Sequence, residues 1–230
     1  MFSMGKTTGI LACVAMGFVL DSLAHAEEPE VIIYREDLSY ILSDADRDHE
    51  SIKTTAHTLT KPTDTIEDKI LKAYNFVTQK IAYIPEPKGV NILQKPSDTL
   101  RKGGDSEDIS VLLVALLYHN SVKTYFIDGE DHAAVLAGPV TGAQNNTFFP
   151  EGALTAFITA YSGISDEHPE GQFVYLEATG GKDGYPGATP TNNNMRTALV
   201  IDIINHTYIA KIGTKPITIK RKDGSFMSYK

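Results

Sequence analysis

The stretch GGDSEDISVLLVALLY, residues 103–118, decides how this chain can fold. Its second part, Ile109–Tyr118, places apolar side chains on every side of a helix rather than along one stripe. Such a helix has to be covered on several sides, so we predict that it lies at the centre of the domain. Two glycines precede it and let the backbone approach its neighbours closely, and His119 and Asn120 end it.

Ser106 stands at the first turn of this predicted helix, where its hydroxyl and its backbone N–H would point toward the same small volume. Unpaired N–H groups and the positive end of the helix dipole would stabilise an oxyanion that forms there. A purely structural alternative is that Ser106 or Asp105 caps the helix, while Glu107 and Asp108 complement its dipole. The motif by itself leaves both interpretations open.

Helical signals lie before this stretch and strand signals after it. A clear helical pattern begins at Ile66 and runs to about Tyr83, where Pro85 and Pro87 stop it. Upstream we expect a short strand at 30–34 and a weak helix within 36–59, and a loop is expected at 86–104. Downstream we expect strands at 123–127, 132–137, 173–178, 198–204, 207–212 and 217–220, one helix at 152–161 and a surface loop at 179–194. Helices first and strands later indicate an α+β domain in which an antiparallel sheet packs on helices.

The first 26 residues have the features of an export signal. Lys6 is followed by an apolar run over Ile10–Leu20 and then by Ala-His-Ala at 24–26, a small-x-small cleavage pattern. We therefore expect cleavage near Ala26 and an exported product, whether periplasmic, at the cell surface or extracellular. A lipid anchor at Cys13 is the alternative, although this cysteine lies inside the apolar run rather than after it.

Residues 27–230 are predicted to form a single domain, with a core at 52–180 and C-terminal strands at 196–230. Cys13 is the only cysteine of the chain, so the mature part has no thiol for disulfides, zinc ligation or thiolate chemistry. The formal net charge of −8 argues against nucleic acid or an anionic membrane as a partner. No apolar stretch after the leader is long enough for a stable membrane span.

We expect neither a cofactor nor a metal ion. Asp44, Asp46 and Asp48 begin like an EF-hand loop, but the glycine and the closing acid of that loop are missing. A second acidic turn at 128–132 could hold a divalent cation, although such polar neighbours usually face water.

His132 and Glu177 stand at the ends of predicted strands, on the rim of the sheet. A lone histidine is more often a structural hydrogen-bonding residue, and a glutamate at a strand end is usually solvated. Together with Ser106, however, they follow the order nucleophile, base and acid. A base has to accept the proton of the nucleophile and an acid has to orient that base, so the three residues form a candidate catalytic site.

The same segments resemble the transglutaminase-like family of the papain-type superfamily. The run Pro96–Leu100 followed by Gly104–Asp108 is similar to its signature, in which a Gly-Asp-Cys-x-Asp turn opens a helix rich in leucine and alanine. His132–Val135 resembles the histidine strand of that family, and Tyr175–Thr179 resembles its acid strand. The helix pattern at 66–83 resembles the helix that precedes the nucleophile.

This resemblance covers roughly residues 52–180 and implies a papain-like core, with the nucleophile helix packed on an antiparallel sheet. It implies that Ser106 is the nucleophile, His132 the general base and Glu177 the orienting acid of amide acyl transfer or peptide hydrolysis. The chain departs from the family in its serine, because a hydroxyl cannot be ionised as a thiol of pKa about 8.5 can. It also has an apparent insertion at 138–171 and a glutamate where aspartate is common.

Two functions remain open at this point. The first is a catalytically impaired domain that keeps the cleft and binds a peptide, a protein or a cell-envelope polymer. The alternative is a slow serine-dependent amide hydrolase, either a protease or an amidase, or an acyltransferase that uses Ser106, His132 and Glu177.

Overall fold

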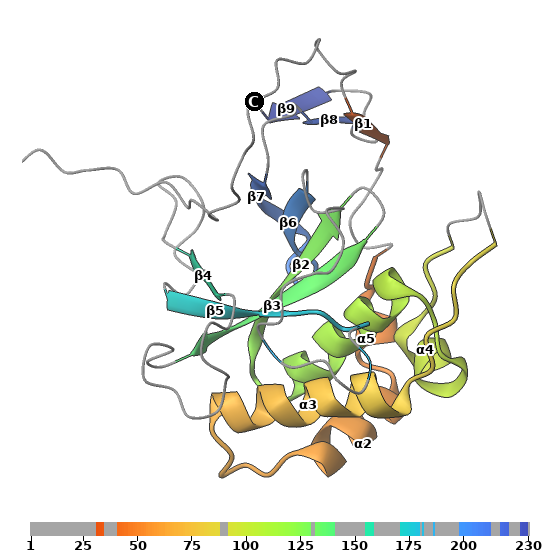
Figure 1. Cartoon of the computed structure of the whole chain (residues 1–230), viewed down its shortest axis with the longest axis vertical. Helices are drawn as coiled ribbons and strands as arrows, with labels where there is room; N and C mark the ends of the chain where they lie inside the picture. The colour runs from red at the N-terminus through yellow and green to blue at the C-terminus, as the bar shows by residue number, and fades with distance from the viewer. Residues whose placement is uncertain are drawn as a thin grey trace, which may run out of the picture.

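The computed structural model describes residues 31–34, 41–87, 92–129, 132–140, 155–158, 171–179, 181, 186, 198–212, 217–220 and 226–229. In these residues the chain forms five helices followed by most of its nine strands (Figure 1). The class is therefore α+β, as the order of the sequence patterns predicts.

The helical layer is built around one central helix. The helices are α1 (Asp44–Arg47), α2 (Glu50–Leu59), α3 (Ile66–Lys80), α4 (Pro96–Lys102) and α5 (Ser106–His119). Every side chain of α5 from Asp108 to Leu117 is buried. Helices α2, α3 and α4 contact α5, and so do strands β2 and β3 (Figure 1). The apolar run thus forms the central helix that it predicts.

Six antiparallel strands form the main sheet in the order β4-β5-β3-β2-β6-β7. They are β2 (Lys123–Gly129), β3 (Ala133–Val140), β4 (Thr155–Ile158), β5 (Gly171–Leu176), β6 (Ala198–Asp202) and β7 (Thr207–Ile212). A second sheet pairs β1 (Val31–Tyr34) in parallel with β8 (Ile217–Lys220), and β8 with the antiparallel β9 (Phe226–Tyr229). In Figure 1 this small sheet lies beyond β6 and β7, away from the helices.

The middle of the main sheet is buried on both faces. Phe126 and Val135 join the core that surrounds α5. Tyr125 and Phe173 belong to a separate apolar cluster, and their ring centroids are 5.2 Å apart. Because successive side chains of a strand point to opposite faces, Tyr125 and Phe126 fall into different clusters.

Two predicted elements are wrong. The loop predicted for 86–104 contains helix α4, which Pro96 can begin because proline at the first helical position loses no hydrogen bond. The helix predicted for 152–161 is replaced over Thr155–Ile158 by strand β4, which pairs with β5. Pairing along the edge of an existing sheet decides the conformation of this segment against its weak local preference.

Several other boundaries can now be compared with the sequence patterns. The weak pattern at 36–59 corresponds to α1 and α2, and α3 ends at Lys80 rather than near Tyr83. The predicted insertion at 138–171 contains the end of β3 and all of β4. The predicted leader at 1–26 and most of the predicted loop at 179–194 lie outside the described residues. The leader and a single domain over 27–230 both stay predictions. No helix in the described ranges has the length and apolar character that crossing a membrane requires.

Candidate functional site

Asp105 rather than Ser106 caps helix α5. Its Oδ1 accepts the backbone N–H of Glu107 at 3.1 Å and that of Asp108 at 3.2 Å. The carboxylate of Asp108 in turn accepts the N–H of Asp105 at 3.4 Å, which completes a capping box. The structural alternative is therefore correct for Asp105, and two of the N–H groups expected to be unpaired are already satisfied.

Ser106 is the first residue of α5 and is half-buried. Neither its N–H nor its hydroxyl has a hydrogen-bond partner among the residues that the structure describes. Ser106 therefore offers two hydrogen-bond donors at the start of the helix, its hydroxyl and its backbone N–H. The Asp105 carboxylate accepts the next two N–H groups of the helix but not that of Ser106.

Gly103 and Gly104 allow the chain to enter α5 at this position. Gly103 has a φ of 87°, and a Cβ atom there would lie 2.3 Å from the carbonyl oxygen of Ala82. A Cβ atom on Gly104 would lie 2.5 Å from the Cβ of Asp108. Gly103 is therefore required by its positive φ and by its close approach to Ala82. Gly104 is required by its close approach to Asp108.

Negative charge gathers at this helix mouth. The buried carboxylate of Asp108 accepts the N–H of Gln94 at 2.7 Å and its side-chain amide at 2.5 Å. The pKa of Asp105 is raised, first by burial and then by the charges of Asp108 and Glu86, against the opposing hydrogen bonds from backbone N–H groups. An added anion would therefore meet neighbouring carboxylates as well as the helix dipole.

The structure brings His132 and Glu177 into contact although 45 positions separate them. The Nε2 atom of His132 lies 2.6 Å from Oε2 of Glu177. Their strands β3 and β5 are antiparallel neighbours, with Val135 opposite Leu176. His132 just before β3 and Glu177 just after β5 consequently meet at the same edge of the sheet.

The carboxylate of Glu177 is buried and fully engaged, and only 8 % of the residue is exposed. Oε2 also accepts the Tyr175 hydroxyl at 3.1 Å, and Oε1 accepts the hydroxyl and the N–H of Thr179 at 2.7 and 3.2 Å. Burial acts to raise the pKa of Glu177, but hydrogen bonds from His132 and Thr179 outweigh it and the pKa is lowered. Glu177 is therefore an ionised, oriented acid and not a solvated strand end.

Two buried tyrosines support this acid. Tyr175 donates to the carboxylate, and the hydroxyl of Tyr74 on α3 donates to the backbone oxygen of Glu177 at 3.0 Å. Burial and the charge of Glu177 raise the pKa of both tyrosines, so both hydroxyls keep the proton that they donate.

The sequence contained a signal for some of these supporting residues but not for all. Tyr175, Glu177 and Thr179 alternate along one strand direction, so their side chains share a face and could have been grouped. Tyr74 could not have been grouped with them, because it lies on α3, 103 positions from the carbonyl that it binds.

His132 keeps one ring nitrogen available for chemistry. Its Nε2 is held by Glu177, and its Nδ1 has no hydrogen-bond partner among the described residues. Helix α5, which Ser106 begins, packs on the strand that His132 precedes. No hydrogen bond joins Ser106 to His132 within the described part of the chain, so two of the three predicted site residues are in contact and the third is not bonded to them.

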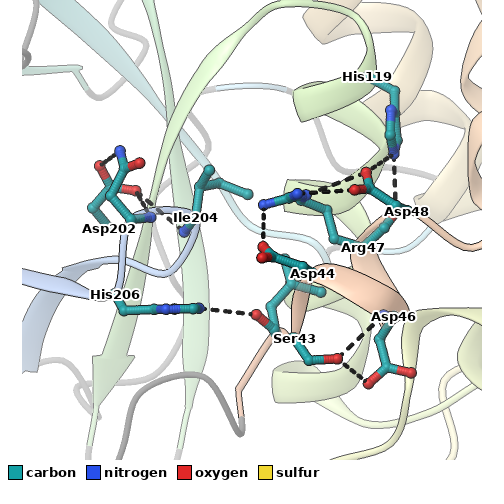
Figure 2. Close-up of polar contacts among 11 residues, drawn as sticks. Ser43, Asp44, Asp46, Arg47, Asp48, His119, Asp202, Ile204 and His206 are labelled. Carbon is teal, nitrogen blue, oxygen red and sulfur yellow. Dashed lines mark hydrogen bonds and ion pairs between the residues drawn. The ribbon is translucent and has the colours of Figure 1, made fainter.

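The acidic residues near α1 are engaged in the local fold (Figure 2). Arg47 forms ion pairs with Asp44 at 2.7 Å and with Asp48 at 2.9 Å, and the Ser43 hydroxyl donates to Asp46 at 2.6 Å. Across the described ranges, no group of three or more His, Cys, Asp or Glu is arranged to hold a metal ion. Glu130 and Asp131 of the second acidic turn lie outside those ranges.

Comparisons with known proteins do not assign a family. No family model matches the sequence, and no curated protein matches it. A crystal structure of a proposed protease from Parabacteroides distasonis is similar over 77% of this chain and 30% of its own length, with 16% identity and a TM-score of 0.43. This chain thus spans less than a third of that protein, and a likeness this low carries no argument for fold or activity.

Proposed function

We propose that this chain is an exported transglutaminase-like domain, with a papain-like core, that binds a peptide, a protein or a cell-envelope polymer at Ser106, His132 and Glu177. The observation that carries the proposal is the contact of 2.6 Å between Nε2 of His132 and Oε2 of Glu177. The hydroxyls of Tyr175 and Thr179 donate to the same carboxylate. Glu177 holds the imidazole of His132 in one orientation, and Nδ1 of that ring has no partner among the described residues. A ring that is fixed in this way is preorganised to bind a ligand through its second nitrogen.

The charges at the helix mouth favour binding over turnover. The N–H and the hydroxyl of Ser106 are both available to donate to the carbonyl oxygen of an amide ligand. Catalysis would require that oxygen to become an oxyanion, and the carboxylates of Asp105 and Asp108 are placed where they oppose this charge. A neutral carbonyl is not opposed in this way.

The second candidate is a slow serine-dependent amide hydrolase or acyltransferase, and the ionised Glu177 favours it. In that reaction Nδ1 of His132 would take the proton of Ser106 as Oγ forms a bond to the carbonyl carbon. Glu177 would stabilise the imidazolium, which would then protonate the departing amine as the amide bond breaks. Nδ1 would then take a proton from water or an acceptor amine as that molecule forms a bond to the acyl carbon. The proton would return to Oγ of Ser106 as the ester bond breaks.

A fluorophosphonate probe separates the two candidates, because it reacts only with a serine that a base activates. We expect the purified chain to stay unlabelled under conditions in which a serine hydrolase control reacts fully. Labelling that disappears in both Ser106→Ala and His132→Ala would overturn the binding proposal and establish the hydrolase.

A cysteine in place of Ser106 tests the site itself. The Ser106→Cys thiol should react with iodoacetamide at pH 6.5 about tenfold faster than a matched Ser97→Cys thiol, because a nearby imidazole favours the thiolate. Ser97 is a suitable control, since it is also half-buried and lies in the first turn of a helix. Adding His132→Ala should remove the difference, and equal rates in the two single variants would show that Ser106 and His132 do not form one site.

A further inference from the structure

A short extended segment with one open backbone edge runs beside the mouth of α5. It follows α3, and Tyr83 forms an isolated parallel bridge with Gly104. The Gly104 N–H donates to the oxygen of Ala82 at 3.1 Å, and the Ile84 N–H donates to the oxygen of Gly104 at 2.8 Å. Both bonds lie on the same side of the segment.

The backbone of Tyr83 faces the other side. Backbone groups of successive residues in an extended chain point in opposite directions, so the N–H and C=O of Tyr83 point away from Gly104. Neither group has a backbone partner among the described residues. An open pair of this kind is a template for one more strand.

The side chains on this edge are large, apolar and accessible. Tyr83 is 57 % exposed and Ile84 is 48 % exposed. The bridge shows an extended backbone at Tyr83. We infer that this conformation continues to residue 86, which would put Tyr83 and Pro85 on one face and Ile84 and Glu86 on the other. The first face is therefore apolar, and the second carries an acid.

The acidic face continues onto the helix mouth. Since Tyr83 is paired with Gly104, the parallel register places Ile84 next to Asp105. Glu86 is close enough for its charge to act on Asp105. Neither Glu86 nor Asp105 forms an ion pair with any residue in the described ranges, and the whole chain has a net charge of −8. A cation on a ligand would thus find two carboxylates without a basic partner in that part of the chain.

We propose that Tyr83 and its neighbours bind an extended peptide with alternating apolar and basic residues, which adds as a strand along this edge. The backbone of the peptide pairs with the N–H and C=O of Tyr83. Its apolar side chains cover Tyr83 and Pro85, and its lysine or arginine side chains meet Glu86 and Asp105. The inference rests on the proposed function, because it names the ligand class of that site. Gly104, which pairs with Tyr83, lies two residues before Ser106.

Three labelled hexapeptides test this proposal by fluorescence anisotropy with the purified full-length chain. The first alternates valine and lysine, the second replaces every lysine by glutamate, and the third is the lysine peptide with its central amides N-methylated. We expect the lysine peptide to bind at least about tenfold more tightly than either of the others, because one lacks the complementary charge and the other lacks the strand hydrogen bonds.

Variants of the chain locate the binding edge. Tyr83→Ser should weaken the lysine peptide about fivefold, as the loss of a cross-strand aromatic contact does. Glu86→Gln should weaken it less and make the affinity less dependent on salt. Tyr118→Ser is the matched control, because Tyr118 is exposed at the opposite end of α5 and should leave the affinity unchanged.

Each outcome separates this inference from the proposed function. One outcome is that Ser106→Ala weakens the affinity for the lysine peptide, whereas Tyr83→Ser and N-methylation of the peptide do not. This result would overturn strand pairing at Tyr83 and leave the proposed function standing. Binding that depends on Tyr83 and not on Ser106 would show that the edge binds the peptide apart from Ser106, and would overturn the assignment of this ligand class to the proposed site. Equal affinity for the lysine and glutamate peptides would overturn the charge assignment. No binding of any of the three peptides at millimolar concentration would overturn the edge, whereas the proposed function is decided separately by the alkylation of Ser106→Cys.

Discussion

Glu177 and Asp202 are both buried carboxylates at strand ends of the same sheet, but their surroundings differ. Asp202 is fully buried at the end of β6, where it closes the turn into β7 (Figure 2). It accepts the N–H of Ile204 at 3.2 Å and that of Asn205 at 3.1 Å, and it forms an ion pair with Lys123. These groups belong to its own turn and to a neighbouring strand.

Glu177 instead directs its carboxylate to a titratable ring. One of its oxygens accepts from His132, whose second ring nitrogen has no partner in the described part of the chain. Both acids satisfy the requirement that buried charge be paired. Asp202, whose partners include backbone N–H groups and a lysine, stabilises the fold. Glu177, which orients an imidazole, is a candidate for a functional role.

The largest effect is expected from Asp202→Ala. It leaves Lys123 without its acid and removes the acceptor of two turn N–H groups, so we expect a loss of about 3 kcal/mol in the free energy of unfolding by urea. Asp98→Ala is the control and should have little effect, because Asp98 pairs with Arg101 and Lys102 at the surface. A stability as high as that of the wild type would mean that Asp202 does not hold the turn.

Tyr175→Phe should have the next largest effect, on the other acid. It removes a buried hydroxyl that donates to an ionised carboxylate, and we expect a loss of about 2 kcal/mol in the same urea measurement. The variant should also slow the alkylation of Ser106→Cys if Tyr175 helps Glu177 to hold His132. A change in stability without any change in thiol reactivity would place Glu177 in the same structural class as Asp202.

Tyr74→Phe removes the hydrogen bond to the backbone carbonyl of Glu177 and leaves the hydrogen bonds of its carboxylate unchanged. The hydroxyl of Tyr74 donates to a neutral carbonyl, so its loss should cost about 1 kcal/mol of stability. Thiol reactivity of Ser106→Cys should stay unchanged in this variant, because the hydrogen bonds of the carboxylate are intact. A large loss of reactivity would show that α3 positions the site as well as the fold.

The smallest expected effect is a change in pH dependence caused by Glu177→Gln. The pKa of Glu177 is lowered in the folded chain relative to its ordinary value of 4.5, so the unfolded chain takes up the proton first as the pH falls. The stabilisation is therefore present above that ordinary value and is lost as the pH falls through the folded pKa. Urea unfolding from pH 7 to pH 3 should show a shallower loss of stability for Glu177→Gln than for the wild type, and identical slopes would contradict the assignment.

Local patterns were sufficient to predict the centre of the molecule. The apolar residues of α5 require cover on several sides wherever the helix is placed, so its burial could be inferred without a fold. The sequence offered Ser106 and Asp105 as alternative caps, and the structure shows that Asp105 is the cap and forms a capping box with Asp108. The strand β4 could not be predicted, since only its pairing with β5 keeps it extended.

The candidate site shows the same division. The order of Ser106, His132 and Glu177 suggested three roles, and these roles stay predictions. The structure shows that His132 and Glu177 are in contact. The support from Tyr74 and the open edge at Tyr83 were not anticipated as parts of the site. Each of these depends on where a second segment of the chain passes.

The sequence by itself determined the central helix, its glycine-bounded start and the α+β class, because these follow from periodicity and from the order of local patterns. Only the tertiary structure decided that an imidazole meets a buried glutamate 45 residues away and that the backbone of Tyr83 is turned outward. The physical reason is that strand register and segment pairing join residues distant in the chain, and no local pattern encodes which pairs will meet.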